Sequence, residues 1–226
     1  MLNFENDVSP IGGWLTKSEG VFLYEIAKYM SPDTPIIEVG SWKGRSTICL
    51  GKGSIEGNKV PVYAIDPHTG SSEHRKFFGI VDTFEQFNLN IKRAAIGPQI
   101  RVMKMTSEDA ARQVKEEVSF VFVDGAHEYE FVKSDYLLWF PKLKEHSSMA
   151  FHDCWHALGV HLFTAQLLLT SSYIRNPRLV DTMTVVEKTE KNTMVERIEN
   201  VAFFLYRLFF GWIGTIKINF PGLTPM

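Results

Sequence analysis

The feature that most constrains this chain is a regular alternation between short β-branched runs and longer stretches with helical periodicity. Each β-branched run ends at a polar residue or next to a glycine, as a strand that enters a loop does. Strands that alternate with helices specify a mostly parallel sheet with helices on both faces, an α/β fold. The predicted strands cover residues 35–39, 61–66, 100–105, 118–123 and 148–151. One predicted helix starts with residues 45–50, and three others cover 83–95, 107–115 and 128–143.

The chain fits one domain with modest additions, since 226 residues are enough for one sizeable core. Thr16 and Glu19 have the spacing of a capping box, which predicts a helix before the first strand. After the last parallel strand we expect one more helix and two strands that form an antiparallel edge. The domain (1–226) therefore divides into a helical lead-in at 1–34, a core at 35–155, and a C-terminal part at 156–226 with a helix at 156–172 and strands at 178–188 and 201–206.

The composition is ordinary for a soluble enzyme and supplies no strongly charged surface. The formal net charge is -2, so we expect no nucleic-acid partner. Cys49 and Cys154 stand far apart and outside any Cys/His cluster, which favours a reducing cytoplasm over a disulfide framework or a zinc site. The acidic N-terminus lacks the apolar centre of a signal peptide.

The apolar run at 201–216 is shorter than the roughly 20 residues of a membrane span, and Arg207 interrupts it. We therefore predict no transmembrane segment. A buried edge strand or a contact between two copies accounts for the run, while Phe209, Phe210 and Trp212 leave an interfacial membrane contact as an alternative. The oligomeric state stays open, and a homo-oligomer is compatible with the sequence.

A glycine turn between the first core strand and its helix indicates a bound small molecule. Gly40 and Gly44 stand four residues apart, where absent Cβ atoms let the backbone approach a ligand. A dinucleotide fingerprint needs a glycine two residues after the first, and Trp42 occupies that place, which argues against an NAD-dependent dehydrogenase. Asp66, at the end of the second strand, can accept hydrogen bonds from both hydroxyls of a ribose.

Four segments in order along the core, IIEVGSWKGRST, VYAIDP, FVFVDGAHEYEFVKSD and MAFHD, resemble class I S-adenosylmethionine-dependent methyltransferases. The chain looks most like their small-molecule O-methyltransferase branch, which includes macrolide-sugar methyltransferases and cephalosporin-hydroxylase-like proteins. The resemblance implies a Rossmann-like fold and S-adenosylmethionine as the cofactor of the core at 35–155. It assigns the ribose to Asp66, the adenine to Ser107 and its neighbours, and the methionine part to Glu38, Gly40, Ser41, Gly44 and Ser46.

Polar residues after the fourth and fifth strands should meet beside the transferable methyl group, because ligands bind at the carboxyl ends of such strands. Asp124 and His127 follow the fourth strand, and His152 and Asp153 follow the fifth. Methyl transfer to a hydroxyl needs a positioned nucleophile and a group that takes its proton. The resemblance implies a divalent cation, Mg²⁺ or Mn²⁺, held by Asp124, His152 and Asp153, and His127 as the general base. Asp124 also counts among the cofactor contacts.

His152 departs from the resembled branch, where an acidic residue often precedes the second aspartate. Since Mg²⁺ prefers oxygen ligands, His152 either shifts the preference towards Mn²⁺ or lies outside the coordination sphere. A plainer interpretation is that Asp124 caps the next helix or binds the cofactor, and that His127 and His152 are hydrogen-bonded core residues.

The leading hypothesis is an S-adenosylmethionine-dependent methyltransferase that O-methylates a small hydroxylated metabolite, sugar-like or polyketide-like, with metal assistance. A cofactor-binding module without catalysis, or with another reaction, is the alternative.

Tyr129 and Lys133 match the Y-x-x-x-K spacing of short-chain dehydrogenases, but they directly follow a strand and no dinucleotide glycine pattern precedes them. We therefore expect both on a helix surface, with Asp135 anchoring that helix. Acceptor specificity falls to residues 68–79, the N-terminal segment and the tail after Arg175.

Overall fold

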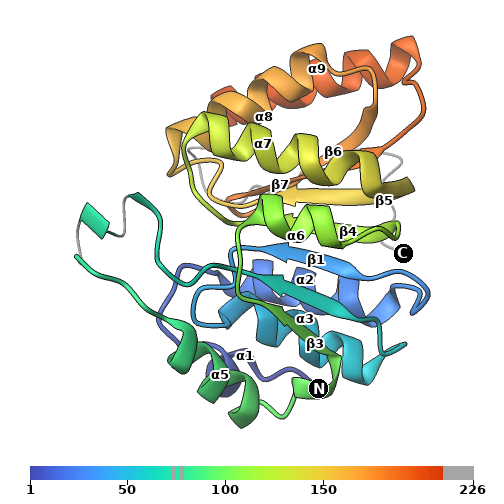
Figure 1. Ribbon diagram of the computed structural model, residues 1–226. Coiled ribbons are helices and arrows are strands. Elements are labelled where there is room, and N and C mark those ends of the chain that lie inside the picture. The colour runs from blue at the N-terminus through green and yellow to red at the C-terminus, as the bar shows by residue number, and fades with distance from the viewer. Residues whose placement is uncertain (73–74, 77–78, 211–226) are drawn as a thin grey trace.

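The computed structural model describes residues 1–72, 75, 76 and 79–210. Its centre is a seven-stranded sheet in the order β3-β2-β1-β4-β5-β7-β6 (Figure 1). The strands β1 to β5 run parallel, β7 is antiparallel to β5, and β6 is antiparallel to β7, which confirms the predicted fold class. The strands are β1 (Ile36–Val39), β2 (Val62–Ile65), β3 (Ile100–Met103), β4 (Val118–Val123), β5 (Leu143–Phe151), β6 (Ile174–Val180) and β7 (Met183–Lys188).

Helices cover both faces of the sheet (Figure 1). One face packs on α1 (Phe4–Asp7), α2 (Lys17–Tyr29), α3 (Arg45–Glu56) and α5 (Phe84–Arg93). The other packs on α6 (Ser107–Gln113), α7 (Tyr129–Trp139), α8 (Leu158–Thr170) and α9 (Met194–Phe210).

Successive residues of the central strands alternate between these two cores, because side chains on a strand point to opposite faces. Ile36 and Phe120 lie in the core beneath α2 and α3, whereas Ile37 and Val121 lie in the core beneath α7 and α8. All residues of β1 and β4 are buried, as expected of strands covered on both sides.

The chain order reverses between β1 and β4, which lie side by side at the centre of the sheet. The backbone pairing continues past both strand ends: the amide of Asp124 donates to the carbonyl of Val39 at 2.8 Å, and the amide of His152 donates to Val123 at 3.0 Å. Such a reversal is where open α/β sheets bind ligands. The residues after β1, β4 and β5 are therefore held at one edge with little freedom.

The predicted strand at 201–206 is wrong, because these residues lie within α9. Glu196 donates its amide to Thr193 Oγ1 at 3.2 Å and accepts the Thr193 amide at 2.7 Å, which is a capping box. The buried residues Asn200, Phe203 and Arg207 then recur at helical spacing. The periodicity of a short apolar run cannot distinguish a strand from a helix. The capping box at Thr193 and Glu196 is the local signal that indicates a helix here.

The antiparallel edge comes instead from a hairpin at 174–188. The single strand expected at 178–188 is divided by a turn at Asp181, whose φ of 48° is left-handed. Residues 211–226, which include Trp212 and the end of the apolar run, lie outside the described residues. Within the residues that are described, no helix is long and apolar enough to cross a membrane.

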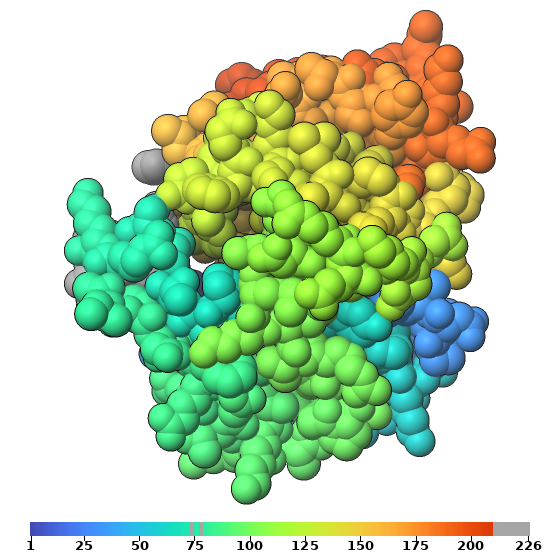
Figure 2. All heavy atoms as spheres, viewed as in Figure 1, coloured from blue at the N-terminus to red at the C-terminus, as the bar shows by residue number. Residues whose placement is uncertain are grey.

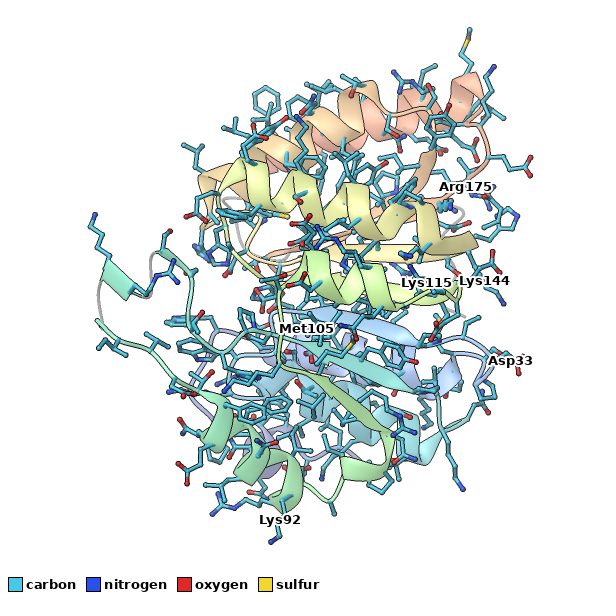
Figure 3. All side chains as sticks on the ribbon, in the orientation of Figure 1. Asp33, Lys92, Met105, Lys115, Lys144 and Arg175 are labelled. Atoms are coloured by element: carbon cyan, nitrogen blue, oxygen red, sulfur yellow. The ribbon has the colours of Figure 1, made fainter. Side chains whose placement is uncertain are left out.

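The edge of the sheet where the parallel strands begin carries a surface ion network and lies opposite the edge where these strands end. Arg175 binds Glu187 at 2.6 Å and Glu196 at 3.4 Å, which joins β6, β7 and α9. The labelled side chains of Lys115, Lys144 and Arg175 lie on this side (Figure 3). The long segment that leaves β2 projects from the other side (Figure 1).

Candidate active site

A cavity of about 210 Å³ opens at the carboxyl ends of β1, β2 and β4. Figure 2 shows the surface hollowed here, between the segment after β2 and the helices α6 and α7. The wall combines the glycine turn after β1, the end of β2, the start of α6 and the first turns of α7. Its polar residues include Asp66, Ser71, Thr106, Ser107, Asp124 and Asp135.

Gly40 allows the ends of β1 and β4 to touch. Its φ is +91°, and a Cβ atom at this position would lie 2.0 Å from the carbonyl oxygen of Asp124. A side chain here would therefore push the two strand ends apart. Gly44, with φ of +90°, is the N-cap of α3, so the amides of the first turn of α3 face the turn.

Two buried polar atoms beside this turn lack hydrogen-bond partners within the described part of the chain. They are Oε1 of Glu38 and Oγ of Ser41. The other carboxylate oxygen of Glu38 accepts a hydrogen bond from Thr47 at 2.6 Å. Burial raises the pKa of Glu38 to about 8, and the charges of Asp124 and Asp66 act in the same direction. Unsatisfied buried polar atoms at a turn built for close approach fit a ligand that carries its own polar groups.

Asp66 is held rigidly at the end of β2. Its carboxylate accepts the backbone amides of Trp42 at 2.7 Å and of His68 at 2.6 Å. Trp42 has a φ of 45°, a left-handed conformation that is rare for a bulky residue. The Asp66 carboxylate thus fixes the glycine turn and still borders the cavity.

Ser107 and Asp135 close the far end of the cavity. The indole Nε1 of Trp139 donates to Ser107 Oγ at 2.9 Å, and Ser107 is also hydrogen-bonded to Asp135. Burial raises the pKa of Asp135 to about 6. Asp135 therefore does anchor α7 against α6, as expected, and in addition it lines the cavity.

A cluster of carboxylates and imidazoles lies on the other side of Asp124. His152 Nδ1 is 3.1 Å from Asp124 Oδ1 and 3.5 Å from Asp153 Oδ2. Donor atoms of Asp124, His152 and Asp153 all lie within 4.8 Å of one another, close enough to share one metal ion. His127 Nε2 lies 3.6 Å from Asp153 Oδ2 and 4.0 Å from Asp124 Oδ1.

His152 is buried between carboxylates on both sides of its ring. Its Nε2 lies 3.1 Å from Oε2 of Glu19, which is itself completely buried. Burial acts against a charged imidazole, but the charge of Asp124 and hydrogen bonds to Asp124, Asp153 and Glu19 outweigh it, so the pKa of His152 lies well above its usual range. Burial likewise acts to raise the pKa of Asp124 and of Glu19, and the contacts with His152 reverse its effect and lower both.

The N-terminal segment forms the outer wall of this cluster. Asp124, His127, His152 and Asp153 line a small cavity together with Trp14 and its neighbours. A wider cavity of about 410 Å³ begins beside it, between Trp14 and Trp42. The guanidinium of Arg45 donates to the carbonyls of Ile11 at 2.7 Å and Leu15 at 2.9 Å, which holds residues 11–15 against the start of α3.

A protein-family model described as a methyltransferase domain matches residues 37–154, just over half of the chain. The chain belongs to this methyltransferase family. The match begins within β1 and ends two residues after His152, so it covers the glycine turn together with Asp124, His127, His152 and Asp153, but not Glu19. This confirms the family resemblance seen in the sequence.

Solved O-methyltransferase structures share the fold of this methyltransferase domain. The O-methyltransferase NovP is similar over 76% of this chain and 80% of its own, with a TM-score of 0.66 and 13% identity. The O-methyltransferase from Bacillus cereus in complex with SAH is similar over 77% of this chain and 83% of its own, with a TM-score of 0.57 and 16% identity. The O-methyltransferase TomG from Streptomyces achromogenes, in complex with SAM, is similar over 82% of this chain and 85% of its own, with a TM-score of 0.56 and 13% identity.

A curated relative, the uncharacterized protein y4gI of Sinorhizobium fredii, is 30% identical over 139 residues. The aligned region is 58% of this chain and 15% of that protein. The methyltransferase domain thus spans a small part of its curated relative's length.

The structure brings most of the predicted site residues of the methyltransferase domain together. Asp66 and Ser107 line the cavity of about 210 Å³, and Ser41 and Ser46 line the small cavity beside His127. Gly40 and Asp124 line both of these cavities. Glu38 and Gly44 lie behind the turn instead and support it. Tyr129 and Lys133 lie along α7, where Tyr129 bonds Gln166 and Lys133 pairs with Glu130, as expected of helix-surface residues.

The sequence alone gives no site role to three residues at the outer side of the site. Glu19 and Trp14 belong to the lead-in, where Glu19 is predicted only as a capping residue and Trp14 belongs to no motif, and Arg45 lies within IIEVGSWKGRST without an assigned contact. A glutamate in a capping box is exposed in most helices, so its burial against His152 has no local signal. An isolated tryptophan in a Gly-rich N-terminal segment, as in IGGW, is the one feature that could have drawn attention to Trp14.

Proposed function

We propose that this chain transfers a methyl group from S-adenosylmethionine to a hydroxyl of a small acceptor, with a divalent cation beside the reacting groups. One observation carries the proposal. Asp124 lines both the cavity beside Asp66 and the smaller cavity that holds His127 and His152. A cofactor in the first cavity would then present its reactive group to the second.

The cofactor cavity suits S-adenosylmethionine better than a dinucleotide. A pyrophosphate needs an unobstructed backbone two residues after the first glycine, and Trp42 stands there. Asp66 would accept the ribose hydroxyls and Ser107 with Asp135 would meet the adenine. Ser41, Ser46 and the amides at the start of α3 would hold the amino and carboxylate groups of the methionine part.

The residues at the edge of β4 and β5 fit a divalent cation. Two carboxylates and one imidazole suit Mn²⁺, and they suit Mg²⁺ less well because it prefers oxygen ligands. Asp124, Asp153 and Glu19 place three carboxylates around the single ring of His152, a charge balance that favours a bound cation. Such an ion supplies a positive charge that orients the acceptor hydroxyl and lowers its pKa.

We infer that His127 acts as the general base. It lines the small cavity beside Asp124, is 22% exposed, and has its Nε2 3.6 Å from Asp153 Oδ2. His127 would take the proton of the acceptor hydroxyl as that oxygen is methylated. S-adenosylmethionine would supply the methyl group from its sulfonium and become the neutral thioether S-adenosylhomocysteine.

The acceptor would enter through the wider cavity between Trp14 and Trp42. Two indoles with Ile80 and Val81 offer flat and apolar surfaces, and Lys43 and Asp82 supply charges of both signs. This lining favours a ring-bearing metabolite with hydroxyl groups over a long peptide or a polyanion. Cys49 and Cys154 are free, buried thiols, which supports a cytoplasmic location.

The first test is calorimetric titration of the cofactor-stripped protein with S-adenosylhomocysteine. We expect micromolar binding to the wild-type protein, on the order of -8 kcal/mol. Asp66→Ala should abolish it, because the variant loses the ribose acceptor and the anchor of the glycine turn. Asn58→Ala, at a site remote from the cavity, is the matched control and should bind normally. Absence of binding to the wild-type protein would refute the proposed activity.

A further inference from the structure

Glu19 lies behind the proposed cation site although it belongs to the helical lead-in. It stands in the first turn of α2, is 0% exposed, and places Oε2 3.1 Å from His152 Nε2. The two residues are 133 positions apart in the chain. They meet because His152 follows Phe151 at the end of β5 and so points to the face of the sheet that α2 covers, as Ala150 does.

The surroundings of His152 leave its two ring nitrogens with different partners. Nε2 faces Glu19, whereas Nδ1 faces Asp124 and Asp153, the other two candidate ligands. The ring of Phe122 lies edge-on at 5.9 Å and limits rotation. Only Nδ1 can therefore reach an ion held by the two aspartates.

We propose that Glu19 is a positioning residue for the cation site. It accepts the Nε2 proton of His152 and keeps it there, so that an ion held by Asp124 and Asp153 would displace the proton on Nδ1 and meet a lone pair aimed at it. A histidine ligand whose other nitrogen donates to a carboxylate is fixed in both tautomer and orientation, and it becomes a stronger ligand. The inference rests on the cation site of the proposed function, and it places His152 inside the coordination sphere.

Glu19 also has structural contacts, which any test must separate from this role. Its Oε2 accepts the Thr16 amide at 2.9 Å, and its Oε1 accepts the amide and the hydroxyl of Thr182 at 3.0 and 2.7 Å. Thr182→Val removes one of these bonds and leaves the carboxylate against His152. It is the matched control for a purely structural effect.

The experiment measures Mn²⁺ binding by electron paramagnetic resonance and S-adenosylhomocysteine binding by calorimetry in four proteins. These are the wild type, Glu19→Ala, Glu19→Gln and Thr182→Val. We expect Glu19→Ala to weaken Mn²⁺ binding by about 10- to 100-fold, the usual effect of losing such a partner. Glu19→Gln should recover part of the loss, because an amide oxygen can still accept the Nε2 proton. Thr182→Val should bind Mn²⁺ like the wild type, and all four should bind S-adenosylhomocysteine equally.

Wild-type Mn²⁺ affinity in Glu19→Ala, or an equal loss of affinity in Thr182→Val, would overturn the inference. Wild-type protein that binds S-adenosylhomocysteine but no Mn²⁺ would refute the cation site and this inference with it, and would leave the methyltransferase proposal standing. If Glu19→Ala fails to fold, nitrogen-15 NMR of the Mg²⁺-loaded wild type decides. A proton on Nε2 and none on Nδ1 of His152 supports the inference, and the opposite tautomer refutes it.

Discussion

Asp124 stands between the two cavities of the site, and its backbone carbonyl is the atom that requires a glycine at position 40. Its carboxylate meanwhile contacts His152 at 3.1 Å. One residue thus sets both the spacing of two strand ends and part of the charge around His152. At this scale the site depends on burial, which holds His152 between carboxylates and leaves Ser41 Oγ without a hydrogen-bond partner among the described residues.

Replacement of His127 tests the proposed base. We expect His127→Ala to lower kcat by about 10²- to 10⁴-fold, the usual contribution of a general base. The affinity for S-adenosylhomocysteine should not change, because the ring lies on the acceptor side of Asp124. Single-turnover kinetics with an acceptor found by screening would measure the first quantity and calorimetry the second. Tyr129→Phe, on the surface of α7, is the control, and full activity in His127→Ala would exclude the assigned role.

At the scale of elements, two helices outside the matched family region shape this domain. The first turn of α2 reaches His152 through Glu19, and α9 covers β6 and β7. Arg207 of α9 is completely buried and donates to the hydroxyls of Thr164 at 2.7 Å and Thr184 at 2.9 Å, which joins α8 and β7 to the helix. Arg207 therefore holds the C-terminal part of α9 against α8 and β7.

The capping box of α9 provides a test at this scale. Thr193→Ala removes the hydroxyl that accepts the Glu196 amide, and we expect the free energy of unfolding to fall by about 1 kcal/mol. Met194→Ala alters the adjacent residue, which is 80% exposed, and should change stability by less than about 0.5 kcal/mol. Urea denaturation of both variants measures the difference. Equal stabilities would mean that packing alone determines where α9 begins.

The stability of the whole molecule should depend on pH through Glu38. Its pKa is raised from 4.5 to about 8 in the folded protein, so the folded state keeps a proton that the unfolded state loses. The contribution of the neutral Glu38 side chain to the free energy of unfolding is fully present below pH 4.5 and is lost as the pH rises through 8. Near pH 5 the Glu38 side chain is therefore neutral in the folded protein and does not destabilise it, whereas above pH 8 it is a buried charge that lowers the free energy of unfolding.

Glu38→Gln should remove this dependence and keep an oxygen that accepts from Thr47. In the cofactor-free protein, we expect the variant and the wild type to have similar Tm values at pH 5. At pH 8.5 the variant should melt several degrees higher, since each kcal/mol corresponds to about 2–4 °C in a protein of this size. Scanning calorimetry across this range measures the difference. A constant difference at all pH values would show that Glu38 is ionised throughout.

The strand alternation and the residues after each strand could be predicted from the sequence because both are local. Hydrophobic period and chain order place Gly40, Asp66, Asp124 and His152 at one edge of a parallel sheet whatever the detailed packing is. The apolar run at 201–206 was misread for the complementary reason: a few apolar residues fit either period.

By itself, then, the sequence determined the α/β architecture, the family, and which polar residues lie at the carboxyl ends of the strands. Only the tertiary structure decided that Glu19 lies against His152, that Arg45 holds residues 11–15, and that Trp14 borders the cavity. Each of these contacts joins residues at least 30 positions apart or depends on how deeply a side chain is buried. Such contacts leave no periodic trace in the chain, because they arise only when separate elements pack together.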